Sequence, residues 1–419
     1  MRHGRTMIIA GAVLATALPA LAHAQGFDVE AATRAYVDTL HGAARAKSDA
    51  YFEGGYWMIL WGALVSAATC WILLRFGLSA RFRDWAERRT KRPALVAALY
   101  ALPYIVTATL ITLPWTIYAG YVREKHYDLM SQDFGGWAGE QAIGLGIGIV
   151  TTALLLAIIF TVIRHAPRLW WLLGAGAMTV FIAIGLLIAP VFIAPLFNTY
   201  SEMPAGPVRD RIVAMAAANH VPAEHIYVFD ASKQSKRISA NVSGLGPTIR
   251  ISLNDNLLNR ASPPEIAAVM GHELGHYVLG HIWRLIGMFG LLFLAGFWLV
   301  HRIAPALIAR HGPGWRVRGV DDPAATPVFF GIAAVLGLLA TPITNSMIRT
   351  SESAADAFGL DAAREPDGFA LTAMKLSEYR KISPGPIEEM LFFDHPSGET
   401  RVRMAMRWKA DHMGEAPAK

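Results

Sequence analysis

The residues with the clearest chemical potential form the run His272-Glu273-Leu274-Gly275-His276. On a helix, residues four apart lie one turn apart on the same face, so both imidazoles can reach one metal ion. Two such histidines favour zinc, and the glutamate between them is placed to act as a general base toward water. The alternative is a helix whose histidines only pack or cap. Because 14 of 419 residues are histidine, chance seldom produces this pattern.

A catalytic zinc site needs a third protein ligand and leaves one position open for water. His281, five residues after His276, lies off the shared helix face, and we expect it to have a structural or supporting role. A later segment offers Glu352 and Asp356, four residues apart. Glu352 can bind the metal while Asp356 accepts the free N–H of a ligand histidine. The alternative for this pair is a solvated acidic helix start.

A third segment runs from His395 to Arg401. Hydrolysis of a peptide bond creates an oxyanion, and a cationic or N–H donor directed at that oxygen stabilises the transition state. His395 and Arg401 are candidates for this role by residue type. Their spacing alone is equally typical of ordinary surface residues.

The chain that must position these residues is strongly apolar. Of its 419 residues, 54% are hydrophobic and 17% are charged, and the mean hydropathy is +0.35. One soluble core cannot hold this apolar excess, so the composition excludes a fully soluble protein and a disordered one. The net charge of +6 comes from short basic runs beside apolar segments, which indicate membrane topology rather than nucleic-acid binding. The single cysteine, Cys70, excludes a cysteine-rich metal site.

Six segments are long and apolar enough to cross a membrane. They are residues 57–78, 94–120, 141–163, 169–194, 285–308 and 326–348. Residues 1–24 have the basic start, apolar centre and Ala-His-Ala end of a signal peptide, with an uncleaved anchor as the alternative. The 79–93 loop carries six basic residues, which predicts a cytoplasmic location. The catalytic residues are then expected on the periplasmic side of a bacterial inner membrane.

These patterns predict a mainly α, polytopic membrane protein with a small α+β zinc metallopeptidase domain. The expected parts are the signal peptide or anchor (1–24), a polar helix with membrane helices (25–194), the domain with the H-E-x-x-H helix (195–284), two membrane helices (285–348), and a C-terminal helical part with the third ligand (349–419). Segments 225–230 and 248–253 alternate like strands, and residues 240–244 between them are expected to form a third strand that ends in a glycine turn. The helix from Pro264 is expected to continue through His281.

Over most of residues 95–408 the chain resembles the type I CAAX prenyl proteases, a family of integral-membrane zinc metalloproteases. The segments that carry the resemblance are Leu113-Pro114-Trp115, Glu124-Lys125-His126, Ile193 to Asn198, His272 to His281, Glu352 to Phe358, and His395-Pro396 followed by Arg401. Tyr127 stands where the family usually has phenylalanine. The family's eukaryotic members present the catalytic domain to the cytosol, whereas the charge distribution here favours the opposite side.

The resemblance implies one Zn²⁺ per chain, held by His272, His276 and Glu352, with Glu273 as the base. It implies that Asp356 orients a ligand, and that His395 and Arg401 contact the substrate or the oxyanion. It also implies an edge strand on which a peptide substrate would add as a further strand. That strand comprises Ala240, Asn241, Val242, Ser243 and Gly244.

The sequence therefore predicts a membrane-embedded zinc metalloendopeptidase that cleaves an extended polypeptide. Its expected partners are the polypeptide substrate and membrane lipid, with no nucleic acid; whether the substrate is cut near its C-terminus, whether it is lipidated, and the oligomeric state are left open. One alternative is a broad-specificity membrane protease for misfolded proteins. Another is a transporter or receptor with a structural metal, which predicts a closed site with four ligands.

Overall fold

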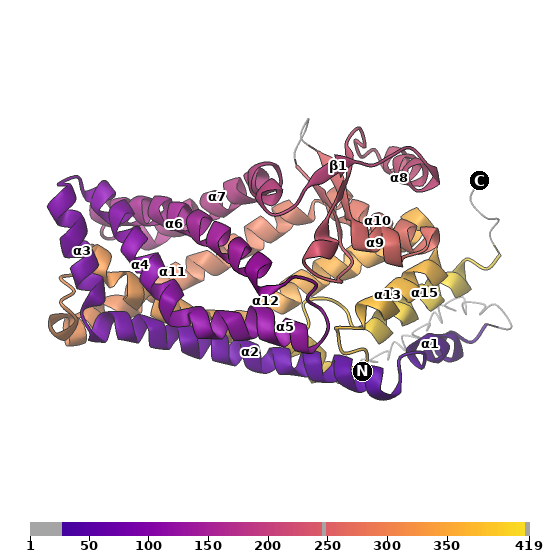
Figure 1. Ribbon diagram of the computed structural model, residues 1–419, viewed down its shortest axis with the longest axis horizontal. Coiled ribbons are helices and arrows are strands. Elements are labelled where there is room, and N and C mark those ends of the chain that lie inside the picture. Colours follow the sequence, from indigo (N-terminus) through magenta and orange to yellow (C-terminus); the bar gives the residue numbers. More distant parts are fainter. Residues whose placement is uncertain (1–26, 245–248, 415–419) are drawn as a thin grey trace, which may run out of the picture.

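The computed structural model describes residues 27–244 and 249–414, so the expected signal peptide lies outside the described residues. Six described helices have the length and hydropathy to cross a membrane, which confirms the predicted number of spans. They lie side by side in an elongated bundle (Figure 1). The helices are α2 (Gly42–Arg75), α4 (Pro93–Ile117), α6 (Phe134–His165), α7 (Trp170–Ile188), α11 (His281–Trp315) and α12 (Thr326–Ala363).

Two of the spans are extended by wider turns near prolines. A π-helical turn, η1 (Tyr118–Val122), continues α4 into the short helix α5 (Arg123–His126). Likewise η2 (Ala189–Ile193) and the 3-10 turn η3 (Ala194–Leu196) continue α7. Proline removes one backbone donor from a helix, and a π turn re-forms the hydrogen bonding around such a position. Both extensions carry the chain from the bundle toward the sheet.

A four-stranded sheet lies at one end of the bundle, in the order β1-β2-β4-β3. Its strands are β1 (Tyr200–Glu202), β2 (Ile226–Phe229), β3 (Ala240–Ser243) and β4 (Arg250–Asn254). Strands β2 and β4 are parallel, and the other pairs are antiparallel. The three predicted strands are present, although Thr248 lies outside the described residues. The sequence did not reveal β1, because three residues are too few to display an alternation.

Helices α8 (Pro207–Ala218), α9 (Asp255–Arg260) and α10 (Pro263–Val278) accompany the sheet. Helix α10 begins with a capping box, in which Glu265 accepts a hydrogen bond from the backbone N–H of Ser262. The predicted continuation through His281 is wrong. Gly280 adopts a left-handed φ of 63°, which ends the first helix and lets α11 begin in a new direction at His281.

Helix α12 runs without a break from the last membrane span to Ala363. No end of a helix lies at the expected boundary near residue 348, so the span and Glu352 belong to one rigid element. Within the described residues three helices follow α12, namely α13 (Pro366–Leu376), α14 (Pro386–Phe392) and α15 (Gly398–Asp411). Helices α13 and α15 lie at the same end of the bundle as the sheet (Figure 1). The N-terminal helix α1 (Val29–Val37) packs with α13 and α15 through a shared apolar cluster.

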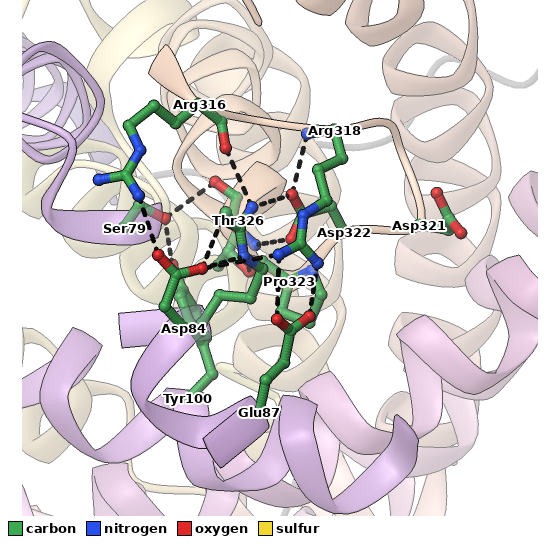
Figure 2. Close-up of polar contacts among 12 residues, drawn as sticks. Ser79, Asp84, Glu87, Tyr100, Arg316, Arg318, Asp321, Asp322, Pro323 and Thr326 are labelled. Atoms are coloured by element: carbon green, nitrogen blue, oxygen red, sulfur yellow. Dashed lines mark hydrogen bonds and ion pairs between the residues drawn. The ribbon is translucent and has the colours of Figure 1, made fainter. Parts of the chain in front are cut away.

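The opposite end of the bundle is joined by a polar network between α3 (Leu78–Arg89) and the segment from Arg316 to Thr326, which includes the 3-10 turn η6 (Pro323–Ala325) (Figure 2). Arg83 is buried and forms an ion pair of 2.5 Å with the buried Asp322. Its guanidinium also donates to the carbonyl of Arg316 at 2.9 Å. The 79–93 segment, expected as a loop, is therefore largely a helix tied to a second connection.

Replacement of Arg83 by methionine is expected to destabilise the protein by about 3–5 kcal/mol, because Asp322 would keep a buried charge without its cation. Thermal or denaturant unfolding of the detergent-solubilised protein measures this loss. The double variant Arg83→Met with Asp322→Asn removes both charges but keeps an acceptor oxygen for the backbone N–H groups of Arg318 and Ala324, so it should recover part of the stability. A single variant as stable as the unmodified protein would contradict the role assigned to this pair.

Candidate metal centre

The two helices that carry the candidate ligands, α10 and α12, are in backbone contact. A Cβ atom on Gly271 would lie 2.7 Å from the carbonyl oxygen of Gly359, and a Cβ on Gly359 would lie 2.7 Å from the backbone nitrogen of His272. Real Cβ atoms do not approach so closely, so only glycine fits at both positions. This close packing brings the acidic face of α12 against the histidine face of α10.

Three candidate ligand groups meet between these helices. The two histidine Nε2 atoms of His272 and His276 are 3.0 Å apart. The carboxylate of Glu352 lies 3.3 Å from the first and 3.4 Å from the second. Zinc with bonds of about 2.0–2.2 Å in a tetrahedral arrangement holds its ligands roughly 3.3 Å apart. The two imidazole nitrogens and the carboxylate converge at separations close to this value, so the donor set fits a divalent metal.

Each histidine is fixed through its other ring nitrogen. His272 Nδ1 lies 2.8 Å from Asp356 Oδ1, as the sequence predicted for a ligand histidine and a supporting carboxylate. His276 Nδ1 lies 3.0 Å from Nδ1 of the buried His281. Thus His281 touches the ring of His276 on the side away from the other candidate ligand atoms, and its supporting role stays a prediction.

Arg401 is buried beneath the carboxylates rather than exposed. Its Nε donates to Asp356 Oδ2 at 2.8 Å, and its Nη2 lies 3.4 Å from Glu352 Oε2. Helix α15 therefore supplies a cation that neutralises both acids of α12. Its expected contact with substrate stays a prediction.

A cavity of about 200 Å³ lies beside the candidate ligand His272, which lines it. Glu273, His395 and Arg401 all line it. Burial raises the pKa of Glu273 to about 7, while the neighbouring His272 opposes the rise. A carboxyl group with a pKa near neutrality is suited to both accepting and returning a proton. His395 Nε2 lies 3.2 Å from Glu352 Oε2, so this side chain also reaches the ligand group.

The edge strand β3 borders the same cavity through Ala240. The carbonyl of Ser239 accepts a hydrogen bond from the backbone of Asn254 at 2.9 Å, so Ser239 faces β4. Alternate residues of an antiparallel strand direct their backbone groups to opposite sides. Asn241 and Ser243 then also face β4, while Ala240 and Val242 direct their N–H and C=O groups away from it. Within the described residues, no strand pairs with this other edge.

The structure thus gathers His272, Glu273, His276, Glu352 and Asp356 in one place, although 84 positions separate the first from the last. It adds His395, Arg401 and Ala240 around the same cavity. The rest of the expected peptide-binding segment continues along β3 and its end, comprising Asn241, Val242, Ser243 and Gly244.

Two features of the centre escaped the sequence analysis. Asp394 Oδ1 lies 2.7 Å from His395 Nδ1, and an acid next to a histidine was the only available signal. Arg380 also lines the cavity, but nothing in its local sequence distinguishes it from a surface arginine.

Comparison with known families decides what kind of protein has this centre. Residues 202–409 match the sequence model of peptidase family M48. Residues 32–199 match the model of a second family, described as "CAAX prenyl protease N-terminal, five membrane helices". The chain belongs to peptidase family M48. It is a membrane metalloprotease of the CAAX prenyl protease type, and membership of a peptidase family counts against the transporter or receptor alternative.

Relatives of this M48 protease extend over most of the chain. An uncharacterized metalloprotease, YhfN of Bacillus subtilis, is 28% identical over 80% of this chain and 79% of its own length. A CAAX prenyl protease 1 homolog of Arabidopsis thaliana is 28% identical over 74% of this chain and 73% of its own. The crystal structure of S. mikatae Ste24p shares the fold, with a TM-score of 0.72 and 20% identity over 90% of this chain and 94% of that one.

The glycine contact between α10 and α12 yields a direct prediction for this M48 protease. Gly359→Val should reduce kcat/KM about 100-fold, because the added side chain forces Glu352 away from the histidines by an amount that a metal centre does not tolerate. Peptide hydrolysis by the purified variant measures the loss. Gly337→Val is the matched control, since it lies on the same helix with nothing within 4 Å of its added Cβ. Equal activities of the two variants would contradict the argument.

Proposed function

We propose that this protein is a zinc-dependent endopeptidase that cleaves extended polypeptides, with one zinc ion held by His272, His276 and Glu352. The observation that carries the proposal is the set of ligand separations of 3.0, 3.3 and 3.4 Å beside an accessible cavity. When bound, zinc acts as a Lewis acid that makes water a stronger nucleophile and polarises the scissile carbonyl.

Glu273 is the proposed general base. It lines the cavity next to the ligand residues, and its raised pKa near 7 suits a group that takes a proton from water and later gives it to the leaving amine. No other carboxylate that lines this cavity is free for the task, within the part of the chain described. The second one, Asp356, is occupied on both oxygens by His272 and Arg401.

His395 is the proposed donor to the oxyanion. It lines the cavity, and its Nδ1 is held 2.7 Å from Asp394, which fixes the ring with Nε2 on the side of Glu352. Arg401 and Asp356 are proposed to keep Glu352 and His272 in their orientations, since both contact these side chains directly. Arg401 is also proposed to add positive potential at the developing charge, because it borders the same cavity.

The peptide substrate is proposed to pair with the outer edge of β3. Ala240 and Val242 direct backbone donors and acceptors to that side, which lets an extended peptide add as a further strand. Main-chain pairing requires an extended backbone but few particular side chains. A broad-specificity protease for misfolded proteins would use the same edge. It would therefore differ from a protease with a defined substrate in the choice of substrate and not in the chemistry of cleavage.

A scan of single N-methyl groups along one extended peptide tests this proposal. N-methylation at alternate residues, those whose N–H groups meet the carbonyls of β3, should lower kcat/KM about fivefold each, because one hydrogen bond is lost. Residues between them should tolerate the change better. Chelation of the metal should abolish cleavage and added Zn²⁺ should restore it. Hydrolysis that survives full chelation would refute the zinc mechanism, and a scan without alternation would refute the pairing.

We also propose that the metal centre lies on the periplasmic side of a bacterial inner membrane. The basic helix α3 and the sheet lie at opposite ends of the bundle (Figure 1). Six basic residues in the 79–93 segment favour a cytoplasmic position for that end. Fusion of an enzymatic reporter at residue 86 and at the C-terminus tests the orientation. Reporter activity that places residue 86 outside the cytoplasm would reverse it.

A further inference from the structure

A hollow of about 360 Å³ lies at the end of the bundle far from the metal centre, beside the polar network of α3. The ends of three membrane spans border this hollow. Pro93, the first residue of α4, lines it, as do Arg164 near the end of α6 and Pro323 just before α12. The ends of membrane spans lie at the level of the lipid headgroups, so this hollow faces the headgroup layer.

Most charges of the hollow are already neutralised within the protein. Arg318 donates to both carboxylate oxygens of Glu87, at 2.6 and 3.0 Å, as Figure 2 shows. These hydrogen bonds lower the pKa of Glu87, which keeps the pair ionised. Asp322 accepts hydrogen bonds from Arg83 and from the backbone N–H groups of Arg318 and Ala324. Neither carboxylate is available to pair with a further cation.

Two cations of the hollow have no carboxylate partner among the described residues. The Nη2 of Arg164 donates to the backbone carbonyl of Asp321 at 3.1 Å, whereas its Nη1 is buried and has no hydrogen-bond partner. Lys91 donates to the backbone carbonyl of Glu87 at 3.2 Å. The carboxylate of Asp321 points away from the network in Figure 2 and is exposed. A buried guanidinium nitrogen without an acceptor is costly unless a ligand supplies one.

We propose that this hollow binds the phosphate-containing headgroup of an anionic phospholipid. Phosphate oxygens are acceptors for guanidinium and ammonium groups, and Arg164 with Lys91 offers one of each. The neighbouring helices present exposed apolar side chains, among them Leu95 and Ile158, along which acyl chains can lie. Basic pockets between membrane helices recognise anionic headgroups by this combination of charge and apolar surface. The lipid would thereby bridge α4, α6 and the connection before α12.

Native mass spectrometry of the full-length detergent-solubilised protein tests the proposal. Phosphatidylglycerol should remain bound at one molecule per chain, and phosphatidylcholine should bind at least tenfold more weakly. The double variant Lys91→Gln with Arg164→Gln should lose about 25-fold in affinity for phosphatidylglycerol, at about fivefold for each basic residue. Lys91→Gln alone should lose about fivefold in affinity for phosphatidylglycerol. Because Lys91 is exposed, this substitution is not expected to disturb folding.

The matched control is Arg92→Gln with Arg168→Gln, two exposed basic residues nearby that do not line the hollow. This pair should retain the affinity within about twofold. Asp321→Asn, which removes the outlying carboxylate, should tighten binding. Equal losses of affinity in the two double variants would overturn the proposal, because they would indicate nonspecific electrostatic attraction between the lipid and the basic surface. Equal retention of the two lipids would also overturn it, as would displacement of the lipid by millimolar inorganic phosphate, which would indicate a site for soluble phosphate.

Discussion

Glu273→Gln should retain its metal and lose peptide hydrolysis about 1,000-fold in kcat. The amide preserves the size of the side chain, but it cannot take a proton from water or return one to the leaving amine, and proton transfer of this kind is worth about 10²–10⁴ in rate. Glu273 supplies none of the three candidate ligand atoms, which belong to His272, His276 and Glu352. The zinc content of the variant should therefore be unchanged. Hydrolysis of a peptide and metal analysis on the same preparation measure both quantities.

The matched control for this variant is Glu378→Gln, which makes the same substitution at an exposed glutamate paired with Arg260. Its kcat should equal that of the unmodified protein. Full activity in Glu273→Gln would remove this residue from the mechanism. Loss of zinc from Glu273→Gln would instead make it part of the metal site and leave the base unassigned.

The membrane architecture was predictable because hydropathy is a local property. Each span contains its own apolar run, so residues 57–78 and 326–348 could be recognised without knowledge of their neighbours. The ends of the helices were less predictable. Gly280 ends α10 by a left-handed turn, and one glycine among many gives no sign of its φ angle. The continuity of α12 past residue 348 depends on packing against α10, which hydropathy does not report.

For the metal centre, sequence spacing was sufficient where a helix turn fixes geometry. His272 and His276 follow this rule, as do Glu352 and Asp356. The contacts between those two pairs depend on the backbone approach at Gly359, which no single segment encodes. The ion pair of Arg83 with Asp322 likewise joins residues 239 positions apart. Such long-range contacts depend on how the membrane spans pack together, so local sequence patterns could not predict them.

Glu352→Ala should lower zinc affinity by more than 100-fold, a larger effect than the 10–100-fold typical of residues that only support a ligand. The two remaining histidine atoms, 3.0 Å apart, would have no anion to complete the charge balance of the ion. The variant would also free Arg401 and His395 from the carboxylate that both contact. Metal analysis after dialysis against a weak chelator measures the loss.

Two comparisons separate a ligand from a merely structural acid. Glu352→Asp keeps a carboxylate on a shorter side chain, so this variant should bind zinc weakly and regain full zinc content at high Zn²⁺ concentration. Glu352→Ala should not regain it over the same range of Zn²⁺ concentration. Asp361→Asn, on the same helix and hydrogen-bonded to Trp408 away from the centre, should keep full zinc content. An unchanged zinc stoichiometry in Glu352→Ala would defeat the assignment of the third ligand. The close approach of α12 to α10 would then serve packing alone, and a different side chain would have to complete the site.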